Sequence, residues 1–146
     1  MLNKNKKNFF FKIERIYTKD VSFESPNSPK IFKKKWNPKI QIDLDTNSYK
    51  LYENFYEVIL KIKLIAKTEE IIAFICEIQK AGIFNISGID KKQISYYLGS
   101  YCPNIIFPYI RESISNQIIN GSFPPLNINP INFDHLFIEH NKINNK

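Results

Sequence analysis

Apolar residues alternate with polar ones through most of the first two thirds of the chain. In the clearest run, 55–67, apolar side chains occupy even positions from 56 to 64, while Glu57, Lys61 and Lys63 occupy odd positions. A period of two is typical of a β-strand with one buried face and one solvated face. Similar runs predict three further strands, at 9–23, 39–44 and 71–79.

The alternation changes phase within the first of these strands. Phe11 and Ile13 take odd positions, Ile16 takes an even one, and Val21 and Phe23 return to odd positions. An extra residue in a strand produces such a shift, so we expect a β-bulge in this strand.

A turn and a basic connection separate the first two strands. Pro26 and Pro29 lack the amide hydrogen that a sheet ladder needs, and the asparagine and serine between them bond to local backbone groups. A lysine-rich connection at 30–35 follows.

From Asp90 onward the apolar spacing changes to three or four residues, which predicts an amphipathic helix with Asp90 as its N-cap. The two apolar rows are Ile94, Tyr97, Tyr101, Ile105 and Ile106, Ile110, Ile114, Ile118. Proline removes a helical hydrogen bond and clashes with the preceding turn, so Pro103 and Pro108 must kink or interrupt this helix. Gly121 is suited to end it as a C′ residue.

The C-terminal segment is an apolar loop followed by a short helix. Residues 122–131 carry three prolines together with Phe123, Leu126 and Ile128, which predicts an extended loop unusually rich in apolar side chains. Asn132 is a suitable cap for the final helix. That helix carries Phe133, Leu136 and Phe137.

Length and composition fit one compact domain. At 146 residues and 43% hydrophobic content, the chain can bury a sizeable core without a metal or a disulfide. We expect a single domain over 1–146 with flexible ends at about 1–8 and 141–146. The only cysteines, Cys76 and Cys102, lie in apolar stretches and are expected to be buried thiols.

The net charge of +7 is carried almost entirely by lysine. Such a charge can attract nucleic acid or an anionic membrane. Only Arg15 and Arg111 supply the planar group that grips phosphate, so we favour a solvated basic surface without nucleic-acid binding. The alternative function is an RNA- or ribosome-associated protein that uses the lysines at 4–12 and 30–39.

The common catalytic and metal-binding motifs are missing. The chain has no phosphate-binding glycine loop, no His-Glu-x-x-His and no Gly-x-Ser-x-Gly. His135 and Glu139 have helical spacing, but two groups underfill a metal shell. We therefore expect no enzymatic activity and no cofactor.

The sequence also lacks the signals of export and membrane insertion. No run approaches the roughly 18 apolar residues of a membrane span, and Lys12 interrupts the apolar start at 9–11. We expect a protein of the reducing cytoplasm, without direct membrane insertion.

Seven short motifs follow one another along residues 11–138. They are IYTKDVSFE (16–24), DLDT (43–46), FICEIQ (74–79), AGIF (81–84), LGSYCPN (98–104), FPYIRE (107–112) and PINFD (130–134). This ordered series resembles the SecB protein-export chaperone family.

The resemblance implies an α+β subunit with a four-stranded antiparallel sheet, a long kinked helix, an extended apolar loop and a short C-terminal helix. Four such subunits would assemble as a dimer of dimers. It also implies a chaperone that holds unfolded secretory precursors without ATP and delivers them to the SecA motor.

Two sets of residues receive roles from the resemblance. The first set is a groove for client polypeptides: Trp36, Ile40, Ile42, Leu44, Phe123, Leu126, Ile128 and Phe137. The second set is expected to contact the basic, zinc-carrying tail of SecA: Asp20, Glu24, Ile75 and Glu77. Strand parity supports the second set, because Asp20 and Glu24 share one parity, as do Ile75 and Glu77, while their apolar neighbours point oppositely.

The overall charge departs from the family pattern. SecB proteins are typically acidic and end in a flexible acidic tail, whereas this chain is basic and ends in HNKINNK (140–146). We expect no second contact with SecA through this tail and weaker long-range attraction to a basic partner.

Overall fold

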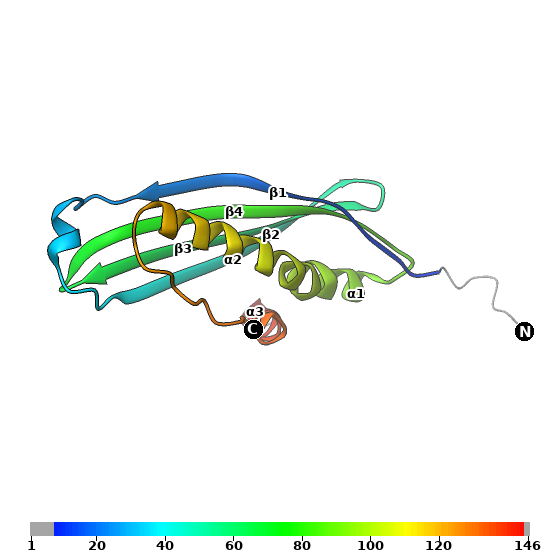
Figure 1. The fold of residues 1–146 in the computed structure, drawn as a ribbon. Coiled ribbons are helices and arrows are strands. Elements are labelled where there is room, and N and C mark those ends of the chain that lie inside the picture. The colour runs from blue at the N-terminus through cyan, green and yellow to red at the C-terminus, as the bar shows by residue number, and fades with distance from the viewer. Residues whose placement is uncertain (1–7, 145–146) are drawn as a thin grey trace, which may run out of the picture.

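The predicted strands form one antiparallel sheet in the computed structural model, which describes residues 8–144 (Figure 1). They are β1 (Phe10–Glu24), β2 (Lys39–Tyr52), β3 (Phe55–Thr68) and β4 (Ile71–Ser87). Their order across the sheet is β1-β4-β3-β2, so β1 and β2 are edge strands. Strands β2 and β4 run further than expected, because polar residues such as Thr46 and Lys80 interrupt the apolar pattern but not the backbone pairing.

Strand β1 contains two irregularities where the alternation predicted one bulge. Its register against β4 shifts between Ile13 and Arg15 and again between Thr18 and Asp20. The two shifts keep the apolar residues on one face: Phe11, Ile13, Ile16, Val21 and Phe23 oppose residues 86, 84, 82, 78 and 76 of β4.

Helices follow the sheet in the chain. They are α1 (Lys91–Tyr96), a π-helical turn (Tyr97–Tyr101), α2 (Cys102–Asn120) and α3 (Phe133–Asn144), and a short 3-10 helix (Lys30–Lys33) lies in the basic connection. Asp90 caps α1 as predicted: its carboxylate accepts from the Gln93 amide at 2.9 Å, and the Gln93 side chain accepts from the Asp90 amide at 3.1 Å. The predicted interruption is the π-helical turn just before Pro103, and α2 continues through Pro108.

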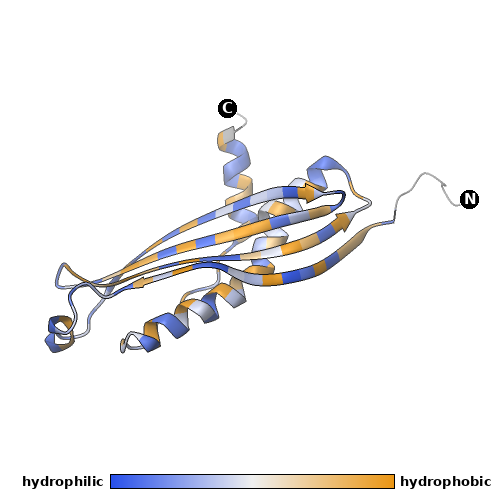
Figure 2. Cartoon of the chain, turned by 90° about the horizontal axis from the view of Figure 1, so that it is seen from above, coloured by the Kyte–Doolittle hydropathy of each residue, from blue (hydrophilic) through white to orange (hydrophobic). Residues whose placement is uncertain are grey.

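The core lies between α2 and the two central strands. One isoleucine row of α2 is buried: Ile106, Ile110, Ile114 and Ile118. It packs with the even-numbered side chains of β3 and β4, among them Leu60, Leu64, Phe74 and Phe84. We call this side of the sheet the helix face and the other side the open face. Hydropathy alternates along the strands accordingly (Figure 2).

The end of α2 differs from the expected glycine cap. Gly121 has a right-handed φ of −78°, whereas the left-handed residue is Ser122, with φ of 67°. Gly121 is needed for its small size instead, because a Cβ there would lie 2.6 Å from the Phe23 ring.

The structure describes only part of the two ends that were expected to be flexible. Residues 1–7 and 145–146 lie outside the described residues, whereas 141–144 form the last turn of α3.

Candidate functional site

An apolar strip on β2 lies beside the core without a helix over it. Helix α2 packs on β4 and β3, and β2 lies outside it at the sheet edge. On the helix face of β2, Ile40 and Ile42 are 38% and 43% exposed, and Leu44 is half-buried. We call these three residues the β2 strip. The structure therefore brings three of the predicted groove residues together as accessible apolar surface.

One end of the helix face is closed by aromatic rings. Phe123 packs against Phe74, Phe32 and Trp36, with ring centroids 5.0, 5.3 and 5.6 Å apart. This packing leaves Phe123 only 5% exposed. Phe123 is therefore a core residue of this subunit, while Trp36 stays half-buried, and contact of either with a client stays a prediction.

The predicted loop residues lie beside α2. Leu126 is half-buried and Ile128 is buried, and both line a hollow of about 610 Å³ together with Pro108 and Arg111 of α2. Ile128, like Phe123, is buried in this subunit, and its contact with a client stays a prediction. The predicted groove residues therefore include both accessible and buried side chains.

A second hollow continues from the β2 strip toward α3. It measures about 320 Å³ and is lined by Leu44, Thr46, Phe133, Leu136, Phe137 and Ile143, among others. The predicted Phe137 lies against Gly99, where a Cβ would be 2.5 Å from its ring. Leu136 and Ile143 are 41% and 72% exposed. Neither was among the predicted groove residues: Leu136 was placed on the final helix without a role, and Ile143 lies in the end that was expected to be flexible.

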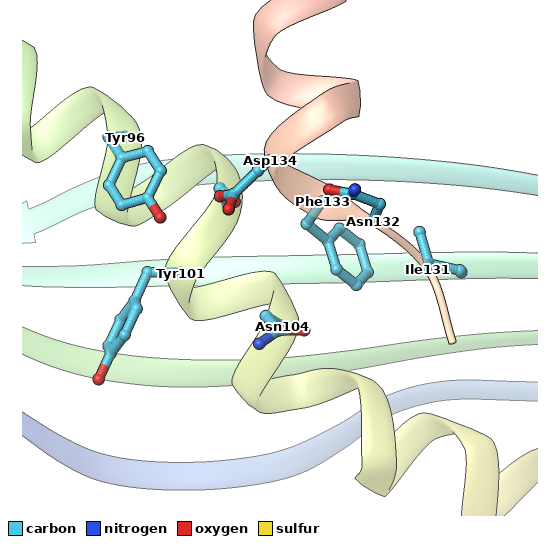
Figure 3. A pocket seen from close by; sticks show the side chains of 8 residues that line it. Tyr96, Tyr101, Asn104, Ile131, Asn132, Phe133 and Asp134 are labelled. Atoms are coloured by element: carbon cyan, nitrogen blue, oxygen red, sulfur yellow. The ribbon is translucent and has the colours of Figure 1, made fainter. Parts of the chain in front are cut away.

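Polar contacts hold the start of α3 to the π-helical turn (Figure 3). The buried Ser100 hydroxyl donates to the Asp134 carboxylate. Hydrogen bonds from Ser100 and then Tyr96 hold the pKa of Asp134 below its usual range. The Asn132 side chain accepts from the His135 amide at 3.0 Å, which confirms the predicted cap. A small set of contacts therefore positions α3, which lines one side of the second hollow.

The four residues expected to contact SecA share the open face at the β1 side of the sheet. Glu24 opposes Ile75 directly, Ser22 opposes Glu77, and Asp20 opposes Gln79. Directly opposed residues of antiparallel strands point to the same face. We call Asp20, Glu24, Ile75 and Glu77 the acidic patch.

Lysines border the carboxylates of the open face. The Lys61 ammonium lies 3.2 Å from the Glu77 carboxylate, and Lys19 lies 3.0 Å from Glu57. Partial burial favours the protonated form of Glu57, but hydrogen bonds from Tyr17 and Lys19 outweigh it and lower its pKa. Burial, with Glu57 alongside, raises the pKa of Tyr17 to about 12. The open face is therefore a mixed-charge surface.

The remaining candidate groups show structural roles. Both cysteines are buried and unpaired, as predicted, and burial raises the pKa of Cys76 to about 11. His135 lies 3.1 Å from Glu139. Among the described residues, no three side chains are grouped as a metal site. Within 8–144, none of the helices is both long and apolar enough to cross a membrane.

Comparison with known proteins gives a match to a family model and similarity to solved structures. The family model described as preprotein translocase subunit SecB matches residues 4–144. The fold is similar to that of the Mycobacterium tuberculosis SecB-like chaperone in complex with a ChAD peptide from the HigA1 antitoxin. That match has a TM-score of 0.70 and 14% identity, over 83% of this chain and 90% of that chain. A Streptococcus agalactiae protein of unknown function aligns with a TM-score of 0.36 and 7% identity over 84% and 98% of the chains, too low a score to indicate a shared fold.

We predict that Ser100→Ala loosens α3 and that acid has the same effect on the unmodified protein. The folded-state pKa of Asp134 is lowered, so its contribution is fully present above the unfolded-state pKa of about 3.9 and is lost as the pH falls through the folded-state value. Hydrogen-exchange protection of α3 amides, measured by NMR against that of α2 amides, tests this. Equal protection of α3 in Ser100→Ala and the unmodified protein, with Ser115→Ala as control, would contradict the assignment.

Proposed function

Because this chain belongs to the SecB family, whose model matches residues 4–144, we propose that it is an export chaperone that holds unfolded secretory precursors. The observation that supports this most is the exposed β2 strip beside the second hollow. Contiguous exposed apolar surface commonly marks a binding site. Such a surface suits extended polypeptides of many sequences because binding requires only that the client has apolar side chains.

Binding of this kind needs no chemical step. A protein that binds the unfolded state shifts the folding equilibrium of its client by mass action, without ATP or a cofactor. Alternate side chains of an extended client repeat at the same interval as Ile40, Ile42 and Leu44 of β2. The chaperone would act in the cytoplasm, without inserting into the membrane.

The assembly we propose is a dimer of dimers. Ile13 and Val21 are exposed on the helix face of β1, Tyr101 is exposed on the π-helical turn beside Phe11 of β1, and Tyr109 is exposed on α2. Subunit interfaces commonly bury apolar and aromatic residues of this kind. Self-association there leaves the β2 strip, at the other edge of the sheet, free for clients.

For delivery, we propose that the acidic patch docks the basic tail of SecA. Asp20, Glu24 and Glu77 supply carboxylates around the apolar Ile75, all on the open face. Clients and SecA would therefore meet opposite faces of the sheet. This separation allows both to be bound at once.

A second candidate is a chaperone dedicated to one partner. It is favoured by the mycobacterial SecB-like chaperone, which was solved with a peptide of an antitoxin. The two candidates share the β2 strip but differ in client range. Binding to several unrelated unfolded precursors supports the export role, whereas binding to none of them supports the dedicated one.

The holdase role predicts that Ile42→Ser weakens binding of an unfolded precursor about tenfold, because the client loses part of its apolar contact. The matched control is Ile65→Ser, the same change on the open face of β3. Suppression of refolding of a denatured precursor, measured over a range of chaperone concentrations, gives the apparent affinity. Equal losses in the two variants would contradict a client site on the helix face.

The docking role predicts that Glu24→Lys weakens binding of the SecA tail peptide about three- to tenfold, because a positive charge then faces a basic partner. Asp43→Lys is the control, with the same charge change on the open face of the distant strand β2. Titration calorimetry at low salt measures both. If Asp43→Lys were as harmful as Glu24→Lys, only the general charge and not the patch would matter.

A further inference from the structure

One carboxylate of the acidic patch already has a cation. The Lys61 ammonium lies 3.2 Å from the Glu77 carboxylate, and their side chains are 41% and 28% exposed. Within residues 8–144, neither Asp20 nor Glu24 takes part in an ion pair. The three carboxylates of the patch are therefore not equally available to a basic partner.

The sheet register explains how Lys61 comes to lie there. Two rows of side chains cross the open face: Asp45, Lys61 and Gln79 in one, and Asp43, Lys63 and Glu77 in the other. Lys63 directly opposes Glu77, yet the ion pair is formed diagonally by Lys61, whose own opposite residue on β4 is the neutral Gln79. Diagonal neighbours in a sheet are within reach of a long side chain.

A second carboxylate also lies close to Lys61. Asp45 opposes it directly on β2, and directly opposed residues have Cβ atoms roughly 5 Å apart. A lysine side chain is long and flexible enough to exchange Glu77 for Asp45. The Asp45 carboxylate is itself bonded only weakly: it accepts a hydrogen bond from the side-chain amide of Asn47 at 3.4 Å.

We infer that Lys61 is an internal competitor that holds Glu77 until a basic partner displaces it, with Asp45 receiving the released ammonium. This inference rests on the proposed docking of the SecA tail at the acidic patch. A partner cation that binds Glu77 exchanges one ion pair for another, so the net gain at this residue is small. Lys61 therefore lowers the affinity of the acidic patch for a basic partner.

The test compares Lys61→Gln with Lys63→Gln in binding a synthetic peptide of the zinc-carrying SecA tail. Each variant removes one charge from the same face of β3, but only Lys61 pairs with Glu77. An exposed ion pair contributes little, so Lys61→Gln should bind the peptide about two- to fivefold more tightly, and Lys63→Gln should gain less. Equal gains in the two variants, or none in Lys61→Gln, would overturn the inference.

A double variant separates competition from the general electric field. In Lys61→Gln/Glu77→Gln, the gain over Glu77→Gln alone should fall to the gain of Lys63→Gln, because the competitor no longer has a carboxylate to hold. A larger gain that persists there would also overturn the inference. Failure of the unmodified protein and of every variant to bind the peptide would instead overturn the docking proposal itself. Circular dichroism confirms that each variant is folded.

Discussion

A single helix is too narrow to cover a four-stranded sheet. Four strands spaced about 4.8 Å apart place the outer two about 14 Å from each other, whereas a helix with its side chains is about 10 Å across. Helix α2 therefore covers the middle of β3 and β4, where helix-face side chains such as Leu60, Leu64 and Phe74 are fully buried, and leaves the corresponding side chains of β1 and β2 in part exposed. Both proposed binding surfaces of the helix face, for clients at β2 and for another subunit at β1, follow from this mismatch of widths.

The second helix adds a wall to the client surface without closing it. Helix α3 reaches the π-helical turn because Gly99 has no side chain in the way of Phe137 and because Ser100 donates to Asp134. These contacts involve few residues, and α3 carries exposed apolar side chains such as Ile143 along the hollow. We propose that α3, which these few contacts hold in place, can shift to fit clients of different sizes. Such a shift would suit a chaperone of low sequence specificity.

Much of this could be predicted from local patterns. The strands, the caps at Asp90 and Asn132, the phase change in β1 and the shared face of the acidic residues all depend on neighbouring positions in the sequence. The family resemblance predicted that the four strands form one antiparallel sheet, but the strand order β1-β4-β3-β2 was not predicted.

What the sequence could not predict depends on residues that are distant along the chain. Phe123 is buried because Phe32, Trp36 and Phe74 surround it. No local sequence pattern predicts these contacts. The pairing of Lys61 with Glu77 depends on the register of β3 against β4. Likewise, Gly121 is required by the Phe23 ring across the core and not by its own backbone conformation.

We propose that unfolded precursors bind the uncovered helix face of β2. A photoreactive amino acid placed at position 42 or at position 41 tests it directly, because these neighbours point to opposite faces of the same exposed strand. With an unfolded precursor bound, we expect strong crosslinking from position 42 and little from position 41. Equal crosslinking from both, or stronger crosslinking from position 41, would contradict it.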